Sequence, residues 1–307
     1  MPSLISPDPD GLPAVITRQE ALAAGLTSDQ IRHRTRSGVW QRMSRGIFLR
    51  GPEALESTHA FQRAVDLHAA RSAAAQREHP DCVIGFESAC ALHALPLVSG
   101  PPGLVQLLVP DGGWTGIRNG VRFRECRLNP SDIQSNGHRV TTPSRTWVDI
   151  ARTRRLADPL SAGDAALRSK QLTIDDAAWL LTELGSIRGV RLAKLALTLI
   201  DGRRETPLES WSFAKFVEWE LPLPTMQREV FDDDGLIGRT DFYWAKCGVI
   251  GEADGALKYS DPAALYAEKR REDRLRACGY TVIRWGWRDL RGPADSLRAR
   301  LTAALTR

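Results

Sequence analysis

The sequence predicts a mixed α/β protein, α+β overall, on three observations. Two helix-start signals and a short strand pair open the chain, helical patterns fill residues 158–221, and strands dominate from Gln227 onward. With 307 residues the chain is long enough for about two domains. We divide it by pattern into a front segment (1–51), a body (52–155), a helical connector (156–204) and a C-terminal domain (205–307).

The front segment carries two capping boxes in close order, Thr17–Glu20 and Thr27–Gln30. In each, the threonine hydroxyl caps a helix and the acid or amide side chain reaches back to the first backbone amide. The helices are expected to end near Gly25 and Gly38, because glycine is a common helix stop. A turn at 44–46 between two short apolar runs predicts a hairpin. This order is typical of a winged helix-turn-helix.

The front segment is also strongly basic. Residues 14–50 contain seven arginines but only two acidic residues, Glu20 and Asp29. Arginines on a recognition helix and its hairpin suit phosphate contacts and base-edge readout. The alternative is a basic helical hairpin that contacts protein. The residues expected to contact DNA are Gln30, Arg32, His33, Arg34, Arg36, Arg42 and Arg45.

The body and the connector are expected to follow as mixed and then helical structure. A long Ala-rich helix is expected from about Pro52 to Glu78, and turn signals at 112–113 and 119–120 separate short strands near 104–109 and 121–126. Further pieces are a helix over 87–95, a strand near 138–140, and a helix that starts at Thr142. The connector reads as helical throughout.

The C-terminal domain is expected to run helix, three strands, helix, strand and a final helix. The first helix starts at Thr206 and Pro207. The expected strands are 227–231, 239–244, 249–254 and 280–285, and the later helices are 262–278 and 294–305.

Acidic residues stand at the ends of two neighbouring strands of this domain. Glu252 and Asp254 are two residues apart and so share one face of a strand, and a hairpin partner would bring Asp241 beside them. Carboxylates that converge in this way suit Mg²⁺ or Mn²⁺, which bind oxygen ligands. Lys258 follows closely, and Glu209 lies on the preceding helix, where it serves as a capping-box acid, a metal ligand or both.

The composition limits the other classes of function. The net charge of +5 and the pI of about 9.1 are compatible with a nucleic-acid partner. The five cysteines include no CxxC pair, which argues against a disulfide framework or a zinc site. The N-terminus lacks the features of a signal peptide, and no apolar run is long enough for a membrane span. A cytoplasmic protein without a membrane partner is expected.

The C-terminal domain resembles the PD-(D/E)XK nuclease superfamily and, within it, the DUF559 family, a relative of the Vsr very-short-patch repair endonucleases. The resemblance covers roughly 200–300. It implies a Mg²⁺-dependent DNA endonuclease in which Asp241, Glu252 and Glu209 hold the metal. One departure is that Asp254 stands where the superfamily commonly has lysine, and Lys258 is offset from that position. The pieces that carry the resemblance are Thr206–Ser210, Gln227, Arg239–Phe242, Gly251–Gly255, Arg271–Leu275 and Gly279–Arg284.

Residues 14–50 also resemble the N-terminal winged helix of AbiEi-type antitoxins, and 83–155 is similar to the body that follows it in that family. This resemblance implies a protein that binds its own promoter and counters a toxin encoded nearby. Two hypotheses therefore stand. The first is a DNA endonuclease. The second is an antitoxin-like transcriptional regulator with a catalytically degenerate nuclease fold.

Overall fold

The computed structural model describes residues 12, 15–50, 59–135, 137–254, 262–291 and 295–306. It is a mixed α+β protein, as the sequence predicts. The chain divides into two compact units: Met1–Ile150 with Thr182–Leu184, and Ala151–Leu181 with Gly185–Arg307. None of the helices in the described ranges is both long and apolar enough to cross a membrane.

The front of the first unit begins with two capped helices, as expected. Thr17 Oγ1 accepts a hydrogen bond from Glu20 N at 3.1 Å, and Thr27 Oγ1 accepts one from Gln30 N at 3.2 Å. The hairpin is also present, and a short strand before the first helix adds an unexpected third strand, in the antiparallel order β1-β3-β2. The elements are β1 (Val15–Thr17), α1 (Arg18–Ala23), α2 (Ser28–Arg36), β2 (Gln41–Ser44) and β3 (Ile47–Leu49).

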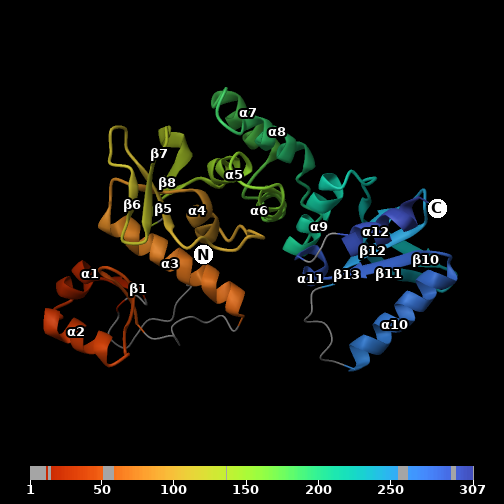
Figure 1. The fold of residues 1–307 in the computed structure, drawn as a ribbon, viewed down its shortest axis with the longest axis horizontal. Helices are drawn as coiled ribbons and strands as arrows, with labels where there is room; N and C mark the ends of the chain where they lie inside the picture. The colour runs from red at the N-terminus through yellow and green to blue at the C-terminus, as the bar shows by residue number, and fades with distance from the viewer. Residues whose placement is uncertain are drawn as a thin grey trace. The chain divides into compact units, whose positions relative to one another are not determined.

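The body of the first unit is a six-stranded mixed sheet with helices (Figure 1). Its strand order is β6-β7-β5-β4-β9-β8, with β5/β7 and β4/β9 parallel and the other pairs antiparallel. The long helix ends at Glu78 as expected, and its described part begins at Ala60; residues 51–58 lie outside the described ranges. The elements are α3 (Ala60–Glu78), β4 (Val83–Ile84), α4 (Phe86–Leu92), β5 (Val105–Val109), β6 (Gly116–Arg118), β7 (Val121–Glu125), η2 (Pro130–Asp132), β8 (Ile133–Ser135), β9 (Arg139–Thr141) and α5 (Pro143–Ala151).

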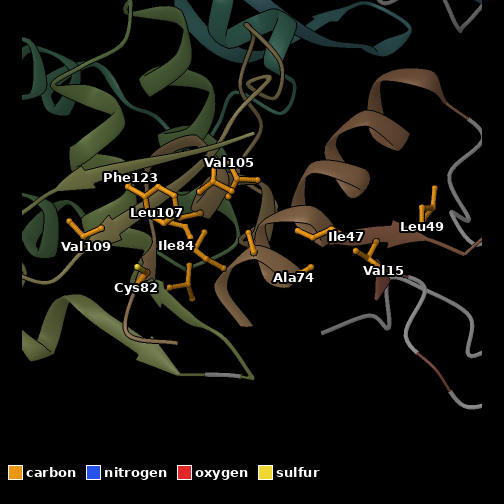
Figure 2. Close-up of a cluster of buried hydrophobic side chains, with 14 residues drawn as sticks. Val15, Ile47, Leu49, Ala74, Cys82, Ile84, Val105, Leu107, Val109 and Phe123 are labelled. Carbon is orange, nitrogen blue, oxygen red and sulfur yellow. The ribbon is translucent and has the colours of Figure 1, made fainter. Parts of the chain in front are cut away.

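One hydrophobic cluster joins the front strands to the body. Val15, Ile47 and Leu49 lie in the same buried cluster as Ala74 of α3 and the apolar side chains of the large sheet (Figure 2). A second, smaller cluster belongs to the front segment alone and centres on Trp40. The front segment therefore has its own small core and also shares the core of the body.

The rest of the chain places helices before and around a four-stranded sheet. That sheet has the order β10-β11-β12-β13, antiparallel except for the parallel pair β12/β13. Helix α11 was not expected, and β11 begins earlier than expected. The elements are α6 (Ala157–Arg168), α7 (Ile174–Glu183), α8 (Val190–Leu199), α9 (Pro207–Glu218), β10 (Thr225–Asp232), β11 (Gly235–Trp244), β12 (Val249–Ala253), α10 (Pro262–Ala277), β13 (Thr281–Trp285), α11 (Trp287–Arg291) and α12 (Asp295–Leu305).

Alternation along β11 and β12 directs side chains to two different helices. Phe242 packs edge to face on Phe216 of α9, with the ring centroids 5.1 Å apart. On the other face, Ile237 and Ile250 cluster with Leu275 of α10. Because neighbouring residues on a strand point to opposite faces, Asp241 lies on the α10 face of the sheet, next to Phe242 on the α9 face.

Candidate functional site: paired carboxylates on the C-terminal sheet

The strand register brings Asp241 and Glu252 together. Phe242 pairs with Gly251 and Tyr243 with Ile250, so continuation of the antiparallel register sets Asp241 opposite Glu252 on one face of the sheet. Asp241 Oδ2 also accepts a hydrogen bond of 2.8 Å from the backbone nitrogen of Ala253. The sequence prediction that a hairpin partner places Asp241 beside Glu252 is thus confirmed.

Glu252 is a buried acid with a basic partner. It is 6% exposed, and Arg271 Nη2 on α10 lies 2.6 Å from its Oε1 atom. Burial raises the pKa of Glu252 to about 8; Arg271 opposes this shift and the nearby Asp241 adds to it. A buried acid beside a second acid is stabilised by any cation that reaches both.

Asp254 belongs to a different set of contacts. Arg284 Nη1 on β13 lies 3.3 Å from Asp254 Oδ2, and Arg284 also pairs with Glu268 and with Glu272. No group of three or more Asp, Glu, His or Cys residues in the described ranges forms a cluster that could hold a metal ion. The expected convergence of three carboxylates is therefore reduced to the pair Asp241 and Glu252. Lys258 lies outside the described residues.

The carboxylate of Glu209 is fully engaged in hydrogen bonds at the start of its own helix. Its Oε1 atom accepts a hydrogen bond of 2.7 Å from Thr206 Oγ1, and its Oε2 atom accepts one of 3.0 Å from Glu205 N. Gln227 Nε2 donates a further bond of 2.9 Å to Oε2. Gln227 lies between the register pairs Met226–Phe242 and Arg228–Thr240, which places it level with Asp241 on β11. The helix is capped by Thr206, whose Oγ1 atom accepts from Glu209 N, and the expected capping box is incomplete because the Glu209 carboxylate accepts from Glu205 N and the Thr206 hydroxyl. The role of Glu209 as a metal ligand stays a prediction.

The basic residues expected to contact DNA differ in their surroundings. Six of them are exposed on α2 or the hairpin: Gln30, Arg32, His33, Arg36, Arg42 and Arg45. Arg34 is half-buried, with its guanidinium 5.3 Å from the centroid of the Trp40 ring. The amide oxygen of Gln30 accepts a hydrogen bond from Thr27 N at 2.8 Å, so this residue serves the capping box.

Four residues near the basic front segment and the paired carboxylates were not predicted from the sequence as site residues: Arg18, Gln227, Arg271 and Arg284. Arg18 follows a capping threonine, where a basic side chain carries no special signal. Arg271 and Arg284 reach the acids from elements that are distant in sequence. Gln227, Arg271 and Arg284 belong to motifs that carry the nuclease resemblance, but those motifs gave no indication of contacts with Glu209, Glu252 or Asp254.

Comparison with known proteins gives relatives without an assigned activity. No protein-family model matches the chain. The uncharacterized protein MT2308 of Mycobacterium tuberculosis strain CDC 1551 / Oshkosh and the uncharacterized protein Rv2248 of strain ATCC 25618 / H37Rv are each 30% identical to it over 172 residues. The match covers 56% of this chain and 64% of each relative, so the chain spans less than two thirds of their length.

One solved structure is also similar. The crystal structure of the RV2827C protein from Mycobacterium tuberculosis has a TM-score of 0.38 and 17% sequence identity, over 72% of this chain and 84% of that chain. A likeness this distant carries no argument about function.

Proposed function

We propose that this protein binds DNA through a winged helix in its front segment and that its C-terminal domain is a metal-dependent endonuclease of the PD-(D/E)XK type, hydrolysing DNA phosphodiesters. The observation that carries the proposal is the Asp241–Glu252 pair on adjacent strands of a mixed sheet. The order α9-β10-β11-β12-α10-β13 is the one expected for such a domain, and the order α1-α2-β2-β3 is the one expected for a winged helix.

The donor set fits Mg²⁺ or Mn²⁺. Mg²⁺ is usually held by one or two carboxylates, with water and substrate phosphate completing its shell. Asp241 and Glu252 supply two carboxylates, and the burial of Glu252 favours a cation at that point. When bound, such an ion polarises a phosphodiester and activates water. Arg271, already beside Glu252, provides a positive charge on the face where the DNA phosphate would lie.

Removal of Asp241 tests the enzyme hypothesis. We expect Asp241→Asn to lower Mg²⁺- or Mn²⁺-dependent cleavage of DNA by more than about 100-fold, since even residues that only orient metal ligands are worth about 10- to 100-fold. Nicking of supercoiled plasmid, together with cleavage of linear duplex and single strands, gives the measurement. Asp234→Asn, an exposed acid on the β10–β11 turn, is the matched control. If wild-type protein cuts none of these substrates with either metal, the enzyme hypothesis is rejected.

The second candidate is an antitoxin-like transcriptional regulator with a degenerate nuclease fold. It is favoured by the arginines at the acids, because Arg271 and Arg284 supply from the protein the positive charge that a metal would provide. It is also favoured by Asp254 in place of lysine. This reading includes a toxin partner encoded nearby.

The two candidates predict different mutant behaviour. For a regulator, promoter binding is lost in the double variant Arg32→Ala/Arg36→Ala and unchanged in Asp241→Asn, and no DNA is cut. Gel-shift titration with the upstream DNA of the gene measures both variants. Binding that is insensitive to moderate salt would contradict phosphate contacts in either reading, because counterion release makes such contacts salt-dependent.

A further inference from the structure

We propose that an arginine-lined hollow between α1, α2 and the β2–β3 hairpin is a phosphate-binding site, and that its occupant is a backbone phosphate of DNA. The DNA source of that phosphate rests on the proposed function, whereas the preference for phosphate rests on the hollow alone. No residue of the C-terminal sheet takes part.

The hollow has a volume of about 400 Å³ and is open to solvent. Four arginines line it: Arg18 from α1, Arg32 from α2, and Arg42 and Arg45 from the hairpin. Two hydroxyl groups, those of Ser28 and Thr35, line it as well. Guanidinium groups donate paired hydrogen bonds to phosphate oxygens, so the lining matches the chemistry of a phosphate group. The Ser28 hydroxyl accepts from Arg18 and keeps its proton to donate, whereas the Thr35 hydroxyl donates to Ile31 O.

The charged side chains that line the hollow are all basic. No acidic side chain lines it. Arg32 Nη2 lies 3.1 Å from Asp29 Oδ1, and both of these side chains are largely exposed, so their attraction is weak. Four cations that share one concave surface repel one another. A bound anion relieves this repulsion and gains from all four at once.

Backbone contacts hold the lining in place. Arg18 N donates a hydrogen bond of 2.6 Å to Gly46 O, which ties the start of α1 to the hairpin turn. Gly46 has φ +82°, a conformation that favours glycine and closes the turn beside Arg45. Arg18 Nη2 donates a hydrogen bond of 2.7 Å to Ser28 Oγ, which links α1 to the first residue of α2. The arginines thus come from three elements whose spacing is set by the fold.

The position of the hollow favours a backbone phosphate. It lies between the helix expected to read DNA and the hairpin expected to act as a wing, where a strand crossing from one to the other would place a phosphate. Its open mouth lets a continuous chain pass, whereas a free nucleotide would use only the local contacts. Arg32, Arg42 and Arg45 are expected from the sequence to contact DNA. The hollow adds Arg18 to these three and does not include Arg36, which does not line it.

The first test uses inorganic phosphate and the full-length protein. The midpoint of thermal unfolding is compared in sodium phosphate and in sodium chloride at equal ionic strength. We expect phosphate to raise the midpoint of wild-type protein, because a ligand that binds only the folded state stabilises it. The double variant Arg18→Gln/Arg45→Gln should lose most of that rise. The control Arg36→Gln removes one exposed arginine of α2 that does not line the hollow, and this variant should keep the rise in midpoint.

The second test uses duplex DNA of several unrelated sequences and fluorescence anisotropy over a range of salt concentrations. The double variant should bind all of them more weakly by a similar factor, because phosphate contacts read no base. The slope of log affinity against log salt should become shallower by about one. Arg45→Glu, a single change at an exposed turn residue, should weaken binding in the same way and guards against misfolding of the double variant.

Each of the following outcomes overturns the proposal. One is equal protection by phosphate in wild type and in the double variant. Another is an equal loss of protection in Arg36→Gln. The third is a free mononucleotide that binds the hollow as tightly as DNA does, which would assign the site to a small ligand. Salt-dependent DNA binding that survives in both hollow variants would show that the hollow does not bind the DNA phosphate, and it would leave the proposed function standing. Phosphate protection without any DNA binding would keep the hollow as a phosphate site and reject the proposed function.

Discussion

At the scale of single residues, the surroundings of Glu252 show what a pattern in the sequence can and cannot predict. Its alignment with Asp241 follows from period-two alternation and a short turn at 245–248, both of which are local signals. Its ion pair with Arg271 depends on how α10 crosses the sheet. Gln227 is similar: its φ of +53° lies in the left-handed region, which no propensity for glutamine predicts, and its side chain reaches Glu209.

His68 gives a pH-dependent prediction at this scale. Its Nε2 atom lies 2.8 Å from Ser88 Oγ, and its Nδ1 atom has no hydrogen-bond partner among the described residues. Burial lowers the pKa of His68 to about 4, with a smaller contribution from Arg71. The unfolded chain, with a histidine pKa near 6.5, therefore takes up this proton first as the pH falls. The stabilising contribution of keeping His68 neutral is fully present above pH about 6.5, and the free energy of unfolding declines below that pH.

The expected loss from His68 is about 2 kcal/mol of unfolding free energy between pH 7.5 and pH 5, from the difference in proton binding between the two states. Urea denaturation at both pH values measures it. His68→Gln should lose less stability than wild type over this interval by about that amount. His33→Gln, at an exposed position, should retain the wild-type dependence. If His68→Gln and wild type decline in parallel, the buried imidazole is not the cause.

At the scale of elements, the sequence predicts best where the signal is local. Both capping boxes form at Thr17 and Thr27, and the turns at 112–113 and 119–120 carry residues with positive φ, including Gly112 and Asn119. The unexpected elements are short pieces, β1, β6, β8 and α11, whose existence depends on a partner strand or a neighbouring helix. Local pattern therefore predicted the long elements, and tertiary packing decided the short ones.

A buried charge cluster joins two elements, α6 and α9, that no pattern in the sequence pairs. Asp164 on α6 accepts hydrogen bonds from Arg204 Nε at 2.6 Å and Nη2 at 2.7 Å, and from Ser210 Oγ of α9 at 2.7 Å. Asp164 and Arg204 are each 1% exposed. Charges this deeply buried are tolerated only with full hydrogen bonding, so the cluster fixes α6 against the start of α9.

Breaking this cluster tests its importance. Arg204→Met leaves the carboxylate of Asp164 buried without its cation and should cost about 3 to 5 kcal/mol of unfolding free energy. Arg203→Met, next to it, removes an exposed arginine paired with Asp201 and should cost at most about 1 kcal/mol. Urea denaturation measures both variants. Comparable losses in the two would show that burial of the pair contributes nothing special.

At the scale of the whole molecule, the segment boundaries predicted from the sequence differ from the limits of the packed cores in the structure. The sequence marks segments where local pattern changes, near 51, 155 and 204. Buried contacts cross two of these positions. Val15, Ile47 and Leu49 share a cluster with the body, and the Asp164 cluster links the connector to the C-terminal domain. Patterns of turns and charges do not report such contacts, because each side of the contact is an ordinary apolar or polar residue in its own segment.

The Asp164 cluster, which crosses the predicted boundary near 204, leads to a prediction about the stability of fragments. A fragment that begins at Ala151 keeps α6, Arg204 and Ser210 together, whereas one that begins at Glu205 loses Asp164 and Arg204 and uncovers the surface of α9 that α6 buries. We expect 151–307 to give dispersed amide resonances in a ¹H–¹⁵N spectrum and a cooperative thermal transition. We expect 205–307 to show a lower midpoint or none, because burial of apolar surface is the main stabilising term. Ser210→Ala in 151–307 is the control: it removes one hydrogen bond from the cluster and should lower the midpoint only slightly. A fragment 205–307 as stable as 151–307 would show that the C-terminal sheet domain folds without the helices before it.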